Sequence, residues 1–445
     1  MNSVPLTPPA LSVGELIDDR PLSSLQKRVV ALCALMVFLD GYDVQALGLA
    51  IPKMAAAFGV PPTAFAPAVS GTLIGMALGA ALLSPLADRF GRRRMSIALL
   101  WWVVLTMVGA TFAMGPWSMA AWRLLSGLGL GALVPVAITL TSEYAPARRR
   151  ASLITLMVSF TALGAFAAGL IAPALEAWGG WRAIFGFGAV APALAALLCA
   201  LALPESLRWR LARDPAHPDV QAQVRRLAGG AAPAVVPDRR PAGDAPRTGP
   251  AALWTRGLRQ RTALLWVLFA TNLFVNYGLI SWLPTLLVQA GWEHAAAQRA
   301  SGVLALSGIV GSLLVSHQAD RGRMLPAMLG AYLLAALALV LLGQAPTSKA
   351  AWIALLAAAG MGAFGAQMAI GSLTAGYYPS EVRSTGVGWA SGVGRIGSFI
   401  GPAVLAAMMG AGAGVPLIVG GLMLPMLVCA ACVLRLPAAV RDLDG

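Results

Sequence analysis

The sequence predicts an all-α membrane protein of about twelve transmembrane helices, arranged as two pseudo-symmetric six-helix bundles. The 445 residues are 58% hydrophobic and 11% charged, whereas a soluble domain has about 25% charged residues. Apolar segments of about 20 residues, long enough to cross a bilayer, follow one another along most of the chain. Similar polar motifs also recur at matching places in the two halves, which is typical of transporters built from internal repeats.

The apolar segments define the order of the elements. In the first half, spans are expected at 29–51, 65–87, 95–114, 117–141, 151–174 and 182–203. In the second half, they are expected at 262–289, 299–318, 324–343, 350–376, 384–408 and 413–434. The predicted domains are therefore bundles over 29–203 and 262–434, with terminal segments 1–28 and 435–445. Residues 204–261 are rich in proline and arginine, and we expect a partly disordered linker with an amphipathic surface helix near 221–227.

Arginine clusters set the expected orientation in the membrane. Arg89 and Arg92 to Arg94 follow the second span, Arg148 to Arg150 the fourth, and Arg321 and Arg323 the eighth. Because positive charge collects on the cytoplasmic side, both termini and the linker are predicted to face the cytoplasm of a bacterial inner membrane. These loops account for much of the net charge of +14. No basic stripe with interleaved aromatics is present, so no nucleic-acid partner is expected.

The four cysteines, two in each half, indicate no metal site and no disulfide framework. They all lie in apolar segments and lack metal-ligand spacing. No nucleophile–base pair or phosphate-binding loop is recognisable either, so we do not expect an enzyme. The expected partners are the lipid bilayer and a small molecule, for a functional monomer without a bound cofactor.

Asp40 and Asp43 are the most informative residues, because they lie inside the first predicted span. A carboxylate at mid-membrane costs at least about 2.5 kcal/mol, which favours a functional role. Residues three apart share a helical face, so one cavity would contact both side chains. Protonation removes the cost of a buried charge, which makes the pair a candidate proton site. The alternative is that both lie near a helix end and face water.

Two arginines in the spans are candidate partners for carboxylates. Arg123 lies in the fourth span and Arg395 in the middle of the eleventh, in a glycine-rich segment. The planar guanidinium fork suits a carboxylate better than lysine does. We expect Arg123 to pair with the span-one aspartates during proton coupling, and Arg395 to bind a substrate carboxylate. The alternative for each is an ion pair or close contact that only braces helices.

Several other polar and aromatic residues are candidates for lining a substrate cavity. They are Tyr42 in the first span, Asn272, Asn276, Tyr277 and Trp282 in the seventh, and Gln367 in the tenth. Asn272 and Asn276 share a helical face, where hydrogen bonding between helices is an equally good interpretation. Aromatic rings would stack on a substrate ring, or simply pack. His217, His294 and His317 suggest no catalytic or metal site.

Repeated motifs at the predicted cytoplasmic helix ends resemble the major facilitator superfamily. Asp88-Arg89-Phe90-Gly91-Arg92-Arg93 matches its best-known loop signature, and Asp320-Arg321-Gly322-Arg323 repeats it. The resemblance implies gating roles for the residues of these loops. Glu143 after the fourth span is matched by Glu381 and Arg383 after the tenth. We expect these helix-end residues to form gating contacts or ion pairs between the halves.

A finer resemblance covers nearly the whole chain. Its motifs are Asp40-Gly41-Tyr42-Asp43, Arg123 to Gly129, Glu143 to Pro146, Ser281 to Pro284, Tyr378 to Arg383, and Gly394-Arg395. They are similar to motifs of the aromatic acid:proton symporter family, whose members import compounds such as 4-hydroxybenzoate, protocatechuate or benzoate. The resemblance implies proton symport of a small aromatic carboxylate by alternating access.

Two alternatives to this function stay open. One is a symporter for another organic anion or a sugar-like metabolite, and the other is a membrane sensor that binds ligand without net transport. An exporter is disfavoured, because the Gly-Pro-x-x-Gly-Gly pattern typical of antiporters is absent from the fifth span. Uptake of labelled substrate into vesicles would separate a carrier from a sensor.

Overall fold

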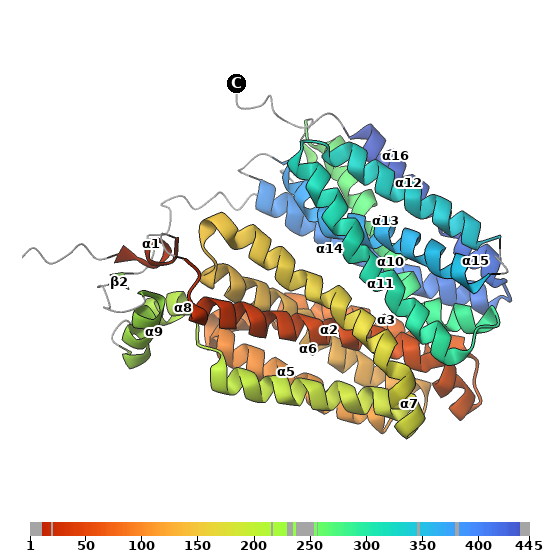
Figure 1. Cartoon of the computed structure of the whole chain (residues 1–445), viewed down its shortest axis with the longest axis horizontal. Helices are drawn as coiled ribbons and strands as arrows, with labels where there is room; N and C mark the ends of the chain where they lie inside the picture. Colours follow the sequence, from red (N-terminus) through yellow and green to blue (C-terminus); the bar gives the residue numbers. More distant parts are fainter. Residues whose placement is uncertain are drawn as a thin grey trace, which may run out of the picture.

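The computed structural model describes residues 11–18, 21–214, 217–228, 235–236, 253–255, 257–344, 348–378 and 382–436. Within these ranges the chain is almost entirely helical, which confirms the predicted fold class (Figure 1). The only paired strands described are β1 (Leu11–Ser12) and β2 (Val235–Val236), which pair in parallel.

The N-terminal half contains four long helices and one helical hairpin. Its elements are α2 (Ser24–Phe58), η1 (Pro62–Phe65), α3 (Ala66–Leu82), α4 (Leu86–Phe90), α5 (Arg92–Thr111), α6 (Pro116–Tyr144), η2 (Ala147–Arg149) and α7 (Arg150–Ala202). Helix α7 bends back on itself at Gly179 and Gly180, whose backbone is not helical. A straight helix of its 53 residues would be about 80 Å long, far more than a bilayer requires. Helix α7 therefore supplies two of the predicted spans.

The C-terminal half repeats this arrangement. Its helices are α10 (Arg259–Gln289), α11 (His294–Asp320), α12 (Met324–Leu342), α13 (Lys349–Ala375), α14 (Arg383–Gly410), α15 (Val415–Gly421) and α16 (Met423–Arg435). Over the described ranges, 11 helical segments are long and apolar enough to span a membrane, with α15 and α16 counted as one. Since the longest segment is the α7 hairpin, the segments correspond to the twelve expected spans.

Close backbone contact fixes the helix that carries the two span-one aspartates. A Cβ atom on Gly41 would overlap the carbonyl oxygen of Thr161, and one on Gly164 would overlap that of Phe38. Helices α2 and α7 therefore pack with their backbones in contact, as small residues allow in membrane proteins. This packing holds the rotation of α2, and with it the direction of Asp40 and Asp43.

Three short helices cover one end of the N-terminal half: α1 (Val13–Asp18), α8 (Leu207–Arg213) and α9 (Pro218–Ala228). The amphipathic helix expected near 221–227 is present as α9, but its predicted place on the membrane surface is wrong. Its apolar residues Val220, Val224 and Leu227 are buried in a core shared with α1, α2 and α8. The apolar face of α9 is therefore used for packing within the protein.

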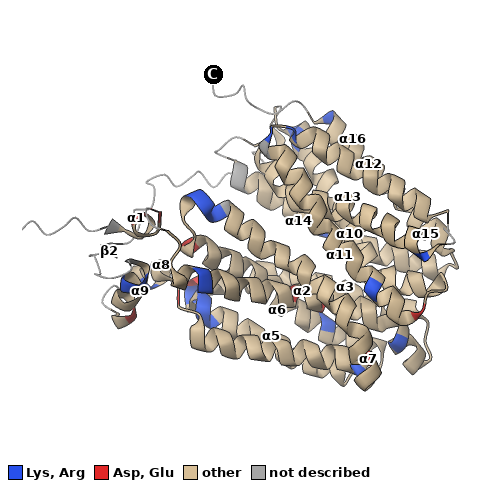
Figure 2. Ribbon diagram, viewed as in Figure 1, with Lys and Arg blue, Asp and Glu red and all other residues tan. Residues whose placement is uncertain are grey.

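We call the end of the molecule that carries α8 and α9 the linker end, and the opposite end the far end. Charged residues gather toward both ends, and the middle of the bundles holds few (Figure 2). The two halves meet through α7 with α11, α2 with α10, and α3 with α14. In Figure 1, α7 and α11 converge toward the far end and separate toward the linker end.

Candidate substrate and proton site

Asp43 and Arg123 form a fully buried ion pair between α2 and α6. Their atoms Oδ1 and Nη1 are 2.5 Å apart, and both side chains are at most 2% exposed. The Ser126 hydroxyl donates to Asp43 Oδ2 at 3.1 Å, and Arg123 Nε donates to the Thr72 hydroxyl at 3.1 Å. The second guanidinium nitrogen donates to the Asp43 carbonyl at 3.2 Å. Because breaking a buried pair typically costs about 3–5 kcal/mol, this network braces three helices as well as linking two charges.

Asp40 lies about one helical turn before Asp43, and its surroundings are different. It is 4% exposed, and its Oδ1 atom has no hydrogen-bond partner in the described part of the chain. The charges of Asp43 and Arg395 both act on it. A buried carboxylate without a full set of partners is unfavourable as an anion. The two aspartates, equivalent in the sequence pattern, therefore have distinct environments: Asp43 is paired and Asp40 is not.

Arg395 in the C-terminal half has no carboxylate partner among the residues that the structure describes. It lies on α14 and is partly exposed, and its guanidinium makes no hydrogen bond or ion pair with any described residue. Gly388 and Gly392 precede it at helical spacing, and a Cβ on either would meet nothing within 4 Å. There is accordingly open space beside this part of α14.

Tyr277 is the predicted aromatic residue that lies next to the buried ion pair. It lines a small cavity between the halves with Val44, Leu47, Gly48, Val69, Thr72, Leu73, Arg123 and Ser281. The cavity has room for about one water molecule, so a benzene ring does not fit there in this conformation. Gln367 on α13 is partly exposed, and its Oε1 atom has no hydrogen-bond partner among the described residues.

Tyr42 and Trp282 occupy packing positions, contrary to the expected contact with a substrate ring. The Tyr42 hydroxyl donates to the Ile184 carbonyl at 2.8 Å, and its ring lies 5.3 Å from that of Phe187. The Trp282 indole donates to the Pro402 carbonyl at 2.9 Å and is fully buried. Both rings bind neighbouring helices of their own half, because buried aromatic hydroxyl and N–H groups need a partner.

Tyr42→Phe is therefore expected to lower stability without changing substrate affinity. The lost hydrogen bond to Ile184 is worth about 1 kcal/mol. A thermal unfolding measurement should show a lower midpoint, and a binding isotherm should be unchanged. If the variant has unchanged thermal stability but binds substrate much more weakly, Tyr42 contacts the substrate.

Asn272 and Asn276 link two helices of the C-terminal half. The Asn272 amide donates to the Ala363 carbonyl at 3.2 Å, and the Asn276 amide donates to Asn272 Oδ1 at 2.9 Å. Both side chains are at most 2% exposed. In this conformation they join α10 to α13, which matches the interpretation of interhelical hydrogen bonding better than that of substrate contact.

The loop motif of the N-terminal half forms an ion-pair chain at the linker end. Arg92 lies 2.8 Å from Asp88 and 3.1 Å from Glu143. Gly91 has a positive φ of 99°, which lets the chain turn sharply into α5. The expected half-to-half ion pair of Glu143 is not what the structure shows, because its partner Arg92 belongs to the same half.

The structure gives contacts for only some of the remaining predicted gating residues. Arg93 donates to the Ala200 carbonyl at 2.5 Å, and Arg89 is exposed beside the ring of Phe90. Arg321 and Arg323 are exposed at the linker end. Glu381 and the side chains of Asp320 and Arg383 lie outside the described residues, so their expected contacts stay predictions.

Asp88→Asn is expected to slow turnover while leaving substrate affinity nearly unchanged. Asp88 is 74% exposed, so its pair with Arg92 is worth at most about 1 kcal/mol, or roughly fivefold in rate. Kinetics in proteoliposomes would separate the two parameters. Normal turnover with much poorer affinity would place Asp88 in the binding site.

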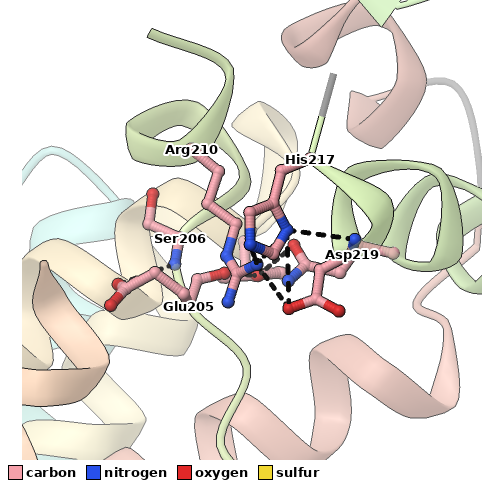
Figure 3. A network of polar contacts seen from close by, with 7 residues as sticks. Glu205, Ser206, Arg210, His217 and Asp219 are labelled. Atoms are coloured by element: carbon pink, nitrogen blue, oxygen red, sulfur yellow. Dashed lines mark hydrogen bonds and ion pairs between the residues drawn. The ribbon is translucent and has the colours of Figure 1, made fainter. Parts of the chain in front are cut away.

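Glu205 is a buried residue in the predicted linker whose hydrogen bonds connect several segments at the linker end. The sequence did not lead us to expect this role. Its carboxylate accepts from the backbone N–H groups of Arg93 and Ser206 at 3.0 Å each, and its carbonyl accepts from the Tyr144 hydroxyl. Next to it, Arg210 pairs with Asp219 beside His217 (Figure 3). Ser206 also caps α8 by accepting from the Trp209 N–H group. In the sequence, a serine N-cap candidate in Pro204-Glu205-Ser206 is the feature that could have predicted an ordered helix here.

Comparison with known proteins places the chain in a family. Residues 33–402 match the model of the Major Facilitator Superfamily. The chain is 34% identical over 436 residues to a gallate transporter of Pseudomonas putida, covering 96% of each protein. It is also 34% identical over 406 residues to the 4-hydroxybenzoate transporter PcaK of Acinetobacter baylyi, covering 90% of this chain and 89% of that protein.

Solved structures agree with this assignment at the level of the fold. The xylose transporter XylE from E. coli superposes with a TM-score of 0.70 at 16% identity, covering 94% of this chain and 99% of XylE. The sequence matches and the two six-helix halves lead to one conclusion. The chain is a multi-pass membrane protein of the major facilitator superfamily, and within it belongs with the bacterial aromatic acid transporters.

Proposed function

We propose that this protein imports a small aromatic carboxylate together with a proton across the bacterial inner membrane by alternating access. The observation that carries the proposal is the combination of an unpaired arginine, Arg395, with a buried carboxylate of incomplete pairing, Asp40, whose charges act on each other. Relatives over nearly the whole chain are named for gallate, 4-hydroxybenzoate and benzoate. These names support an aromatic acid as the cargo.

In this proposal, Arg395 binds the substrate carboxylate. Its guanidinium has no hydrogen-bond or ion-pair partner among the described residues, and a Cβ on Gly388 or Gly392 would meet nothing within 4 Å. Tyr277 packs against the substrate ring from α10, and Gln367 supplies a polar contact from α13. The remaining predicted aromatic residues, Tyr42 and Trp282, support these helices from behind.

Asp40 carries the proton in this proposal. Bringing a monoanion into a negative interior costs about 2.3 kcal/mol per 100 mV, and one co-transported proton cancels the charge. Neutralising Asp40 also removes a negative charge that acts on Arg395, so that the arginine is available to the substrate. Proton binding and anion binding then favour each other, which is the requirement for coupling.

Asp43 and Arg123 transmit this change between helices. Arg123 on α6 is held by Asp43 on α2 and by Thr72 on α3, and Ser126 on α6 donates to the same Asp43 carboxylate. A change in the charge of Asp40, about one turn away on α2, alters the field in which this pair sits. The pair thereby links the protonation state of α2 to the positions of α3 and α6.

The contacts between the halves are consistent with alternating access, because α7 and α11 converge at the far end. We assign the linker end to the cytoplasm, because the arginine clusters around Arg92 and Arg149 lie there. The far end, where α7 and α11 meet, is then extracellular and closed. In this proposal the conformation is inward-facing and the transporter functions as a monomer.

A screen of radiolabelled acids in proteoliposomes tests the proposed function. With an acidic exterior, hydroxylated benzoates should accumulate inside, and phenylpropionates, aliphatic acids and sugars should compete weakly or not at all. Preferential uptake of an aliphatic acid or a sugar would overturn the substrate class. Saturable binding without uptake in any arm would point to a sensor.

A further inference from the structure

Glu176 and His294 make a close polar contact across the two halves at the far end, which is an ion pair when the imidazole is protonated. Glu176 lies on α7 just before its Gly179–Gly180 bend, and His294 is the first residue of α11. We propose that these two residues are an extracellular latch, which holds the outer side closed in the inward-facing conformation and opens in the outward-facing one. The inference rests on the proposed transport function and orientation.

The geometry of the pair is that of a partly buried contact. His294 Nε2 lies 2.8 Å from Glu176 Oε2, and the side chains are 16% and 8% exposed. Gln298, one turn further along α11, donates from its amide to the Leu49 carbonyl on α2 at 3.4 Å. Three polar side chains thus connect α11 to two helices of the other half.

Glycines beside the latch let the helices approach until it can form. A Cβ on Gly169 of α7 would lie 2.6 Å from the Gln298 carbonyl oxygen and 3.0 Å from the backbone of Gly302 on α11. A Cβ on Gly48 of α2 would lie 2.8 Å from the carbonyl oxygens of Ile280 and Ser281 on α10. These positions belong to opposite halves, so their close contact exists only while the far end is closed.

The latch has a physical reason to act as a switch. A carboxylate as buried as Glu176 is unfavourable when its partner is removed, whereas in an open outer vestibule water would solvate both groups. The contact between Glu176 and His294 therefore favours the closed far end over the open one. The other acidic residue nearby, Glu293, is exposed and forms no ion pair with a described residue.

The latch can be tested by measuring distances between pairs of spin labels. The full-length protein is reconstituted in nanodiscs without substrate. Labels at Lys53→Cys and Ala350→Cys report the far end, and labels at Ala147→Cys and His317→Cys report the linker end; all four positions are exposed. Glu176→Gln and His294→Gln should each shift the far-end population to longer distances and the linker-end population to shorter ones. Glu293→Gln is the matched control and should leave both distributions as in the wild type.

Reversing the pair provides the rescue. The double variant Glu176→His with His294→Glu should restore the wild-type distances, and the glutamate at the start of α11 suits the helix dipole. In transport, the single variants should lower turnover while apparent affinity for external substrate stays equal or improves, because more molecules face outward.

Unchanged distances in both single variants, or a reversed pair that behaves like them, would overturn the latch. Longer far-end distances without shorter linker-end distances would show that the contact is purely structural. That result would also overturn the latch. Since the distances require no substrate, the latch is tested independently of the aromatic acid screen.

Discussion

Asp40→Asn is expected to abolish pH-driven accumulation of substrate while leaving substrate exchange intact. An asparagine mimics the protonated aspartate in shape and lacks its charge, so the variant binds substrate but has no proton to release. Exchange of internal for external substrate requires no proton movement and should continue. The expected signature is loss of concentrative uptake together with near-normal counterflow, measured on the same proteoliposomes.

Asp43→Asn is the matched comparison, three residues away on the same helix. Asp43 is the partner of Arg123, so this substitution leaves a buried guanidinium without its counter-ion. Such a loss costs about 3–5 kcal/mol and should appear as poor thermal stability. Concentrative uptake that survives in Asp40→Asn would contradict the assignment of the proton to Asp40.

Arg395→Lys is expected to weaken binding of the substrate acid strongly. Lysine keeps the positive charge but lacks the two parallel N–H groups that grip a carboxylate. A charged hydrogen bond is worth roughly 1–3 kcal/mol, which corresponds to roughly 5- to 150-fold in Kd. Titration calorimetry or tryptophan fluorescence on the purified protein would give the change.

The methyl ester of the same acid is the control for this variant. It keeps the ring and removes the anionic charge, so it should bind the wild type poorly and be little affected by Arg395→Lys. Equal binding of the acid to the variant and the wild type, or of the ester and the acid to the wild type, would show that the carboxylate is held elsewhere.

Long-range features of the fold were predictable from the sequence because they depend on local composition. Apolar segments of bilayer length identify the spans, and the separate spans expected at 151–174 and 182–203 correspond to the two arms of α7 on either side of its bend. The surface position expected for α9 was wrong because amphipathicity alone does not say what covers the apolar face. Here that face meets α1 and α8, which lie elsewhere in the sequence.

The candidate site was predictable as a set of residues, but not in its pairings. Two aspartates on one helical face favour a shared site, yet only the structure shows Asp43 bound to Arg123 and Asp40 without a full set of partners. The directions of Tyr42 and Trp282 depend on carbonyl groups of other helices. The Glu176–His294 contact joins residues of different halves, for which local sequence holds no signal.

The central claim, that substrate and proton enter together, is tested most directly by proton flux. Proteoliposomes containing a pH-sensitive dye are clamped at zero membrane potential and given 4-hydroxybenzoate without a pH gradient. The account predicts internal acidification that follows substrate entry, disappears in Asp40→Asn and is absent with the methyl ester. Entry of labelled 4-hydroxybenzoate with no internal acidification would contradict it.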